Sequence, residues 1–166
     1  NPNKYLERFL ATENIPILIF QIRKLIENEA PSANHYSAKK VLVEWGNQPV
    51  GTTEEAHLEK IFDSLHLYRT TYDGLVFFWK DEVQCCLYSG YRPESDRDAT
   101  DLPPEEIANA VRQLLADSIS LPLADLVKAC AQEFGFTRMG SNIDTVMQRG
   151  INKAIKKNYA KIDNEK

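Results

Sequence analysis

The chain has 166 residues, of which 43% are hydrophobic and 27% are charged, a composition that supports a folded core and excludes intrinsic disorder. Its longest apolar runs, residues 15–20 and 75–79, fall well short of the roughly 18–20 residues that span a bilayer, so no membrane segment is expected. Three cysteines, two of them adjacent, exclude a disulfide framework, and the lack of an export signal indicates a cytoplasmic protein. The chain starts at Asn1-Pro2 without a methionine, so we expect a piece of a longer protein.

The net charge of −4 conceals an asymmetry along the chain. Residues 1–126 contain 12 Lys and Arg against 20 Asp and Glu, whereas residues 127–166 contain 8 against 4. Phosphate contacts depend on local positive charge, so the basic end keeps nucleic-acid binding open. An equally weighted alternative is that the basic residues form a helix face that is only solvated.

The first half of the chain reads as helices followed by a hairpin. A short helix is expected over 3–12 and a longer one over 15–28, with an apolar face formed by Ile19, Ile22, Leu25 and Ile26. A second helix over 36–45 ends at Gly46, and a third begins at Thr52 as a capping residue, with Glu55 three positions later, and runs to about residue 65. Over residues 67–72 and 75–79 the pattern of apolar side chains changes to a period of two residues, which predicts two strands. Asp73-Gly74 between them predicts a tight hairpin turn.

The second half repeats this order. Pro103-Pro104 opens a helix, the next helix spans 122–134 and ends at Gly135, and a third runs from the cap Ser141, with Asp144 three positions on, to about 158. Tyr159 to Ile162 reads as the first strand of a second hairpin, with residues 163–165 as its turn and no return strand in the sequence.

A shift of 89 residues aligns the two halves as two copies of one module, the alternative being a chance similarity between two helical stretches. It places Trp45-Gly46 on Phe134-Gly135, Thr52 on Ser141 and Phe62 on Ile151. Three helices followed by a hairpin is the order of a winged helix, so we predict a mainly helical α+β chain of tandem winged-helix-like modules with the second wing truncated. The expected boundaries are an N-terminal helical extension over 1–14, a first module over 15–82, a linker over 83–102 and a second module over 103–166.

No catalytic or metal-binding motif is present in the sequence. The phosphate-binding loop Gly-x-x-x-x-Gly-Lys, the dinucleotide-binding Gly-x-Gly-x-x-Gly and the Gly-x-Ser-x-Gly elbow are all missing. The three histidines have no Cys-x-x-Cys partner, and Asp96, Asp98 and Asp101 lack the glycine and glutamate of a calcium loop, so a solvated linker is favoured there. Cys130 is expected to pack as a small hydrophobic residue. We therefore expect no enzyme activity, metal or cofactor in this chain.

The third helix of the second module carries the candidate site. Its spacing turns Ile143, Met147, Ile151 and Ala154 toward the core, and the opposite face combines amide, hydroxyl and basic side chains that reach bases and phosphates in a major groove. Arg138 precedes the helix and is placed to hold a phosphate at its N-terminus, or to pair with a carboxylate of the first helix. The candidate DNA-binding residues are Arg138, Ser141, Thr145, Gln148, Arg149, Asn152, Lys153, Lys156 and Lys157. The equivalent face of the first module has Glu55, Glu59 and Asp63, which would repel DNA.

Residues 114–128 and 133–143 resemble a bacterial domain of unknown function found at the C-terminal end of proteins related to superfamily-one DNA helicases, often beside a nuclease domain. Residues 29–31 and 44–51 fit the same pattern, although the family tends to have arginine where Pro49 stands. The resemblance implies DNA and the helicase or nuclease domains of a parent chain as partners, and it assigns no catalytic residue here. Two functions stay open: a non-catalytic accessory module that binds DNA through the second module, or a protein-interaction or structural docking module of the same parent.

Overall fold

The computed structural model describes residues 2–46, 49–118 and 120–163. Helices make up 62% and strands 8%, so the chain is mainly helical and belongs to the α+β class, as predicted. Contacts divide it into two compact units, residues 1–86 and 87–166, which are described separately below.

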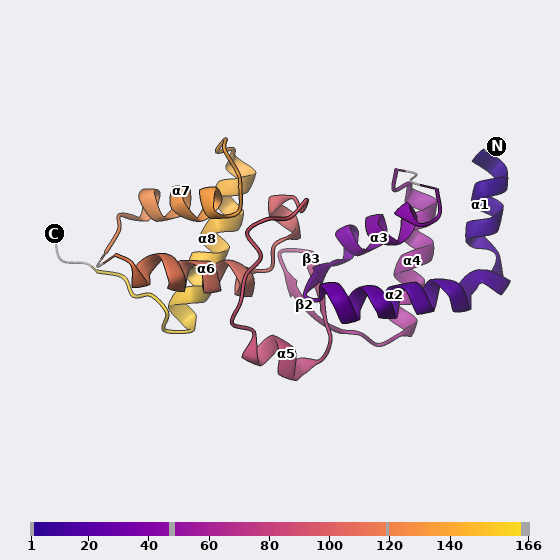
Figure 1. The fold of residues 1–166 in the computed structure, drawn as a ribbon, viewed down its shortest axis with the longest axis horizontal. Helices are drawn as coiled ribbons and strands as arrows, with labels where there is room; N and C mark the ends of the chain where they lie inside the picture. Colours follow the sequence, from indigo (N-terminus) through magenta and orange to yellow (C-terminus); the bar gives the residue numbers. More distant parts are fainter. Residues whose placement is uncertain (1, 47–48, 119, 164–166) are drawn as a thin grey trace. The chain divides into compact units, whose positions relative to one another are not determined.

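The first unit combines helices with one small sheet, which lies at one end of α2, α3 and α4 (Figure 1). The predicted helices are present, with ends shifted by a few residues. Its elements are α1 (Pro2–Leu10), a 3₁₀ turn (Thr12–Asn14), α2 (Ile15–Glu29), β1 (Ser32–Ala33), α3 (Asn34–Val43), α4 (Thr52–Ser64), β2 (Tyr68–Tyr72), β3 (Leu75–Trp79) and α5 (Glu82–Leu87).

The predicted hairpin is confirmed as β2 and β3. Asp73 and Gly74 both have positive φ, 50° and 83°, which is the backbone of a two-residue turn that follows strand twist. A two-residue strand that the sequence analysis missed, β1, pairs with the other edge of β3, through Ser32 opposite Phe78. The sheet order is therefore β1-β3-β2, entirely antiparallel, with β3 in the centre.

The core of the first unit forms where α2, α4 and β3 meet. Ile22 and Ile26 are buried as expected, and Leu18 joins them, whereas Ile19 and Leu25 lie at its edge. The rings of Phe62 from α4 and Phe78 from β3 pack with centroids 4.9 Å apart. The hairpin is thus part of the core of this unit.

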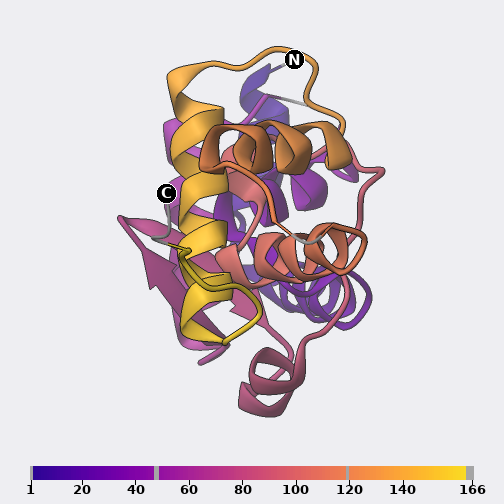
Figure 2. The ribbon, with the colours of Figure 1, turned by 90° about the vertical axis from the view of Figure 1, so that its left-hand side faces the viewer.

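The second unit contains α6 (Pro104–Ala116), α7 (Leu123–Glu133) and α8 (Ser141–Lys156), preceded by a 3₁₀ turn (Ala99–Asp101). In Figure 2, α8 crosses both α6 and α7. Met147, Ile151 and Ala154 are buried, which confirms the predicted core face of α8, and Ile143 is half-buried. Gly150 faces Ile107 of α6 so closely that a side chain at position 150 would overlap that isoleucine.

The predicted helix caps are wrong in both units. Thr52 and Ser141 are the first residues of their helices and do not cap them, and the capping positions belong to Gly51 and Gly140. The carbonyls of these glycines accept the N–H groups of Glu55 and Asp144 at 3.0 Å, so each helix starts one residue earlier than the hydroxyl side chain suggested.

Helices α7 and α8 end in the same way. Gly135, at φ 85°, lets the N–H of Phe136 reach the carbonyl of Ala131 at 2.9 Å, so the predicted glycine stop is confirmed. Asn158 does the same for α8 at φ 62°, and turns the Tyr159 N–H back to the Ala154 carbonyl at 2.8 Å.

The strand expected from Tyr159 to Ile162 is therefore not formed. The turn at Asn158 folds the Tyr159 ring back against the core of the unit, where the Arg112 guanidinium lies 5.0 Å from its centroid. Residues 159–163 have no regular secondary structure. The residues expected for the turn of this hairpin extend to 165, and 164 and 165 lie outside the described residues.

The expectation of a solvated linker is wrong for Arg97 and Asp101, which are both buried. Arg97 forms a two-point ion pair with Glu106 of α6, with Nη1 donating to Oε1 at 2.8 Å. The backbone N–H and guanidinium of Arg92 donate to the same carboxylate at 3.0 Å, and Asn109 donates to the carbonyls of Tyr88 and Gly90. Residues 87–102 thus belong to the second unit, and these hydrogen bonds and ion pairs hold them against α6.

Burial raises the pKa of the Glu106 carboxyl, but the hydrogen bonds and charges of Arg97 and Arg92 outweigh it, so that the pKa lies below its ordinary value. The Glu106 carboxyl is therefore ionised at neutral pH, and the guanidinium groups of Arg97 and Arg92 balance its charge. The sequence gives no sign of this pairing, because the arginines stand in a segment without periodicity.

We predict that Gly150→Ala destabilises the protein. An alanine would gain about 1 kcal/mol of helix propensity, but the overlap with Ile107 forces α6 and α8 apart at a cost of about 1–3 kcal/mol. The expected result is a lower urea midpoint by circular dichroism. Gly90→Ala is the matched control, since nothing lies within 4 Å of its new methyl group, and equal stability of both variants would contradict the prediction.

We predict that Glu106→Gln lowers the free energy of unfolding by about 3–5 kcal/mol, because it leaves buried Arg97 without its counter-charge. The exposed Glu94→Gln is the control, with a change within about 0.5 kcal/mol. Since the folded-state pKa of Glu106 is depressed, its contribution is present above the unfolded value of about 4.3 and is lost as the pH falls through the folded value. The difference between wild type and Glu106→Gln should accordingly shrink in acid, and a difference that does not change with pH would refute the assignment.

Candidate nucleic-acid interface

Five of the predicted residues form one exposed stripe along α8. Their spacing of three or four residues keeps them on one side of the helix, and each of them is exposed. These residues are Ser141, Thr145, Gln148, Asn152 and Lys156. The structure therefore brings together the hydroxyl, amide and ammonium groups that the sequence analysis placed on this face.

Two of these polar side chains are held by their own helix. The Thr145 hydroxyl donates to the Ser141 carbonyl at 2.9 Å, and the Gln148 amide donates to the Asp144 carboxylate at 2.7 Å. Because the Gln148 amide uses its nitrogen as the donor in this bond, the bond fixes the orientation of the amide and leaves its oxygen available as an acceptor. Asn152 and Lys156 continue the stripe over the next two turns.

Lys153 departs from the predicted pattern. It was expected to be an exposed cation in line with Arg149 and Lys156, but its ammonium lies 3.8 Å from the carboxylate of Glu105 in α6, whose side chain is only 3% exposed. Arg149, on the same flank of α8, is half-buried. Because α8 crosses α6 closely at Gly150, Lys153 on this flank meets α6. The helical glycine was the sequence signal for this crossing.

The remaining two candidates lie at the ends of α8. Arg138 is exposed in the turn before the helix, as is Ser141 at its first position. Lys157 follows the last turn, and its ammonium lies 5.6 Å from the centroid of the Tyr159 ring, which holds it near the helix C-terminus. Positive charge is therefore present at both ends of the stripe.

The equivalent helix of the first unit, α4, has the acidic surface that the sequence predicted. Several of its carboxylates have partners within the unit: Glu59 accepts from the Asn34 amide at 3.0 Å, and Asp63 lies 3.2 Å from Arg69. Glu55 lies 3.8 Å from the imidazole of His35. This helix presents negative charge with local partners, which disfavours contact with a phosphate backbone.

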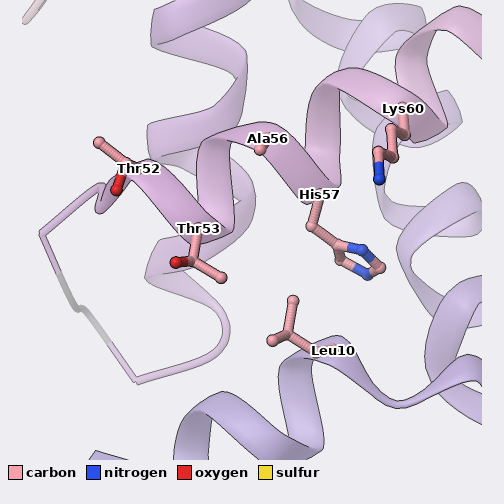
Figure 3. A pocket seen from close by; sticks show the side chains of 6 residues that line it. All are labelled: Leu10, Thr52, Thr53, Ala56, His57 and Lys60. Atoms are coloured by element: carbon pink, nitrogen blue, oxygen red, sulfur yellow. The ribbon is translucent and has the colours of Figure 1, made fainter.

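A small open pocket of about 390 Å³ lies beside α4 (Figure 3). It is lined by Leu10 from α1 and by Thr53, His57 and Lys60 from α4, with no carboxylate. Burial, and secondarily the charge of Lys60, lowers the pKa of His57, so the imidazole is neutral at pH 7. A neutral histidine that packs edge-on against Phe9, with centroids 5.5 Å apart, is a packing residue of the α1–α4 contact.

Groups that could bind a metal ion do not gather in the described part of the chain. No three His, Cys, Asp or Glu side chains there could jointly hold a metal ion. Cys130 is fully buried in the core of the second unit, as expected, and burial raises the pKa of its thiol to about 12. No helix in the same described ranges is long and apolar enough to cross a membrane.

Comparison with known proteins adds no relative. No family model, no curated protein and no solved structure matches this chain. The surface of α8 and the fold within each unit are therefore the grounds for the function proposed below.

We predict that Lys153→Ala destabilises the protein by about 1 kcal/mol or more, whereas Lys156→Ala changes stability by less than about 0.5 kcal/mol. The first substitution removes the cation beside the buried Glu105 carboxylate, and the second removes an exposed charge. Thermal denaturation of the two variants at equal ionic strength measures the difference. Two identical melting temperatures would mean that Lys153 is as free as the sequence suggested.

Proposed function

We propose that this chain is a non-catalytic accessory module that binds DNA through α8 of its second unit. In line with the sequence resemblance, we assign it to a helicase-related parent protein whose motor or nuclease domains perform the chemistry. The observation that carries the DNA-binding proposal is the continuous exposed stripe of Ser141, Thr145, Gln148, Asn152 and Lys156.

The topology of the first unit supports a winged-helix-like design. Its elements follow the order α2, β1, α3, α4, β2, β3, and its sheet has the order β1-β3-β2. In helix-turn-helix proteins the recognition helix enters the major groove, and α4 takes that position in the repeat. By the 89-residue correspondence, α8 is its counterpart in the second unit.

The side chains of α8 suit the two parts of DNA recognition. Gln148 and Asn152 have amides that can pair with adenine edges, and Arg138 and Lys156 are exposed cations for the phosphates. Lys153, which the buried Glu105 engages, is not assigned to DNA. Binding is expected to be weak, since few cations contribute, and its salt slope should reflect the small number of phosphate contacts.

A protein-docking role for the first unit is the alternative. In its favour, α4 has an acidic surface, and α2 exposes two large apolar side chains, Ile17 and Phe20. Both features suit contact with a protein partner, whereas the acidic surface would repel the phosphates of DNA. Failure of the chain to bind DNA at low salt would favour this alternative.

The test is a salt titration of duplex binding by the double variant Arg138→Ala with Lys156→Ala. Each lost phosphate contact should lower the slope of log affinity against log salt by about one, so the slope should fall by about two. Neither side chain is buried, so the melting temperature should stay close to that of the wild type.

Lys60→Ala on α4 is the matched control, because it removes an exposed cation from the equivalent helix of the first unit. Its salt slope should equal that of the wild type. If the double variant binds as tightly as the wild type, α8 is not the DNA-binding surface and the proposal fails.

A further inference from the structure

Helix α1 is held on the first unit by one aromatic cluster. It has nine residues, fewer than the roughly 12–15 that an isolated helix needs in water, so it depends on packing. The ring of Phe9 is fully buried, and its centroid lies 5.6 Å from that of Trp45 and 5.5 Å from that of His57. Tyr5 stacks on Phe9, and the guanidinium of Arg8 lies over the Trp45 ring. The docking of α1 therefore depends on the contacts of Tyr5, Phe9, Trp45 and His57.

This aromatic cluster contains two polar atoms that are enclosed without a hydrogen bond. They are Nε2 of His57 and Oη of Tyr5, neither of which has a partner among the described residues. A buried polar atom that loses water and gains no partner weakens the contact that covers it. Helix α1 is therefore held less firmly than the apolar area of Phe9 alone would suggest.

The imidazole of His57 is the group in this contact that can change its charge near neutral pH. Its ring is directed from α4 toward Leu10 of α1, and Lys60 lies one turn further along α4 (Figure 3). Burial, and then the charge of Lys60, lowers the pKa of His57. Burial and the charge of Glu54 raise the pKa of Tyr5, so the phenol stays protonated while the imidazole titrates.

The carboxylates of α4 are placed away from the imidazole. Glu55 and Glu59 meet side chains of α3, and Asp63 pairs with a side chain of β2. The carboxylate of Glu54 lies against the backbone of Gly51 at the start of the helix. No acid on α4 is therefore in position to compensate a proton gained at His57.

The other helices packed on α4 add no compensating acid to this contact either. Helix α2 contributes Leu18 and Ile22 to the core that it shares with α4. On α1, Lys4 and Glu7 are exposed, and the charged group in contact with the cluster is the guanidinium of Arg8. A protonated imidazole would therefore meet the positive charge of Lys60 and the rings of its aromatic neighbours.

We propose that α1 is a strap, which acid releases from α4 by protonating the imidazole of His57. Protonation places a positive charge where Nε2 is enclosed and where Lys60 repels it. In the released state the imidazole is open to water, which solvates its charged form. Release uncovers Trp45 and the side of α4 that Phe9 covers, and it leaves the packing of Phe62 on Phe78 in place.

The direction of the pH dependence follows from the lowered pKa of the docked His57. In the released state the imidazole takes its ordinary value of about 6.5. Above that pH both states have a neutral imidazole, and docking is strongest. As the pH falls below about 6.5, the released state binds the proton more readily. The ratio of released to docked α1 therefore rises by up to about tenfold per pH unit, until the pKa of the docked state is reached.

Hydrogen exchange of the 166-residue chain at about pH 7.5 and about pH 5 tests the proposal. Protection factors are compared, because they remove the intrinsic effect of pH on exchange. The protection of α1 should fall about threefold or more at the lower pH, and the protection of β3 should not change. The ion pairs of Glu106 persist at both values, because its pKa lies below the ordinary range.

Three variants separate the role of His57 from other effects of acid. His57→Leu keeps an apolar side chain against Phe9 and cannot be protonated, so its α1 protection should be equal at the two pH values. Lys60→Ala removes the repulsion, so the fall in protection should be smaller than in the wild type. His35→Gln is the matched control, because this imidazole is exposed on α3, and the wild-type fall should persist in it.

Equal protection of wild-type α1 at the two pH values would overturn the proposal. An equal fall in His57→Leu and the wild type would overturn it as well, because the imidazole would then have no part in the change. A loss of protection in β3 together with α1 would show unfolding of the whole unit instead of release of a strap. If leucine at position 57 lowers the protection of β3 at about pH 7.5, Lys60→Ala decides, and a fall as large as that of the wild type refutes the proposal.

Discussion

The second unit is organised by two adjacent carboxylates, Glu105 and Glu106, that are buried in the first turn of α6. A buried charge without a partner costs several kcal/mol, so each must be matched by a cation. Glu106 is matched by Arg92 and Arg97, which fixes the segment before α6, and Glu105 is matched by Lys153, which ties α8 to α6. These pairings determine which basic residues stay on the surface. A count of lysines and arginines in the basic C-terminal quarter therefore overstates the charge available to a phosphate backbone.

The two units use one order of helices but complete their cores differently. In the first, the hairpin contributes Phe77, Phe78 and Trp79, all fully buried, so the core includes a sheet. In the second, Asn158 turns the chain back after α8, and the Tyr159 ring joins the core. This turn leaves residues 159–163 as an irregular segment. A single residue in the left-handed region thus sends the chain back onto the core instead of into a strand.

The sequence predicted what depends on local periodicity and turn chemistry. The helices, the Asp73-Gly74 hairpin, the stop at Gly135 and the buried face of α8 all follow from the spacing of apolar residues and from glycine's freedom at positive φ. The missed features are long-range. Nothing in the sequence pairs Arg97 with Glu106 or β1 with β3, because such contacts depend on where the helices bring distant residues. The capping positions failed for a smaller reason: at each start, a glycine precedes the hydroxyl residue, and its carbonyl already accepts the first helical hydrogen bond.

The candidate site could be predicted as far as it depends on the spacing of residues along one helix. Helix α8 shows where such prediction ends, because its neighbours decide which of its side chains stay exposed. Its polar stripe follows from spacing alone, but its two flanks are set by neighbours. On one flank, α6 approaches Gly150 so closely that Lys153 pairs with Glu105 of α6. The charge of Lys153 is therefore no longer free on the surface of α8. On the other, Ile151 and Ile155 line a groove of about 1250 Å³ in the second unit, together with Gln148 and Asn152. Those two amides therefore belong both to the stripe proposed for DNA and to this groove. The cations Arg138 and Lys156 do not line the groove, so they are the residues at which DNA contact is tested separately from it.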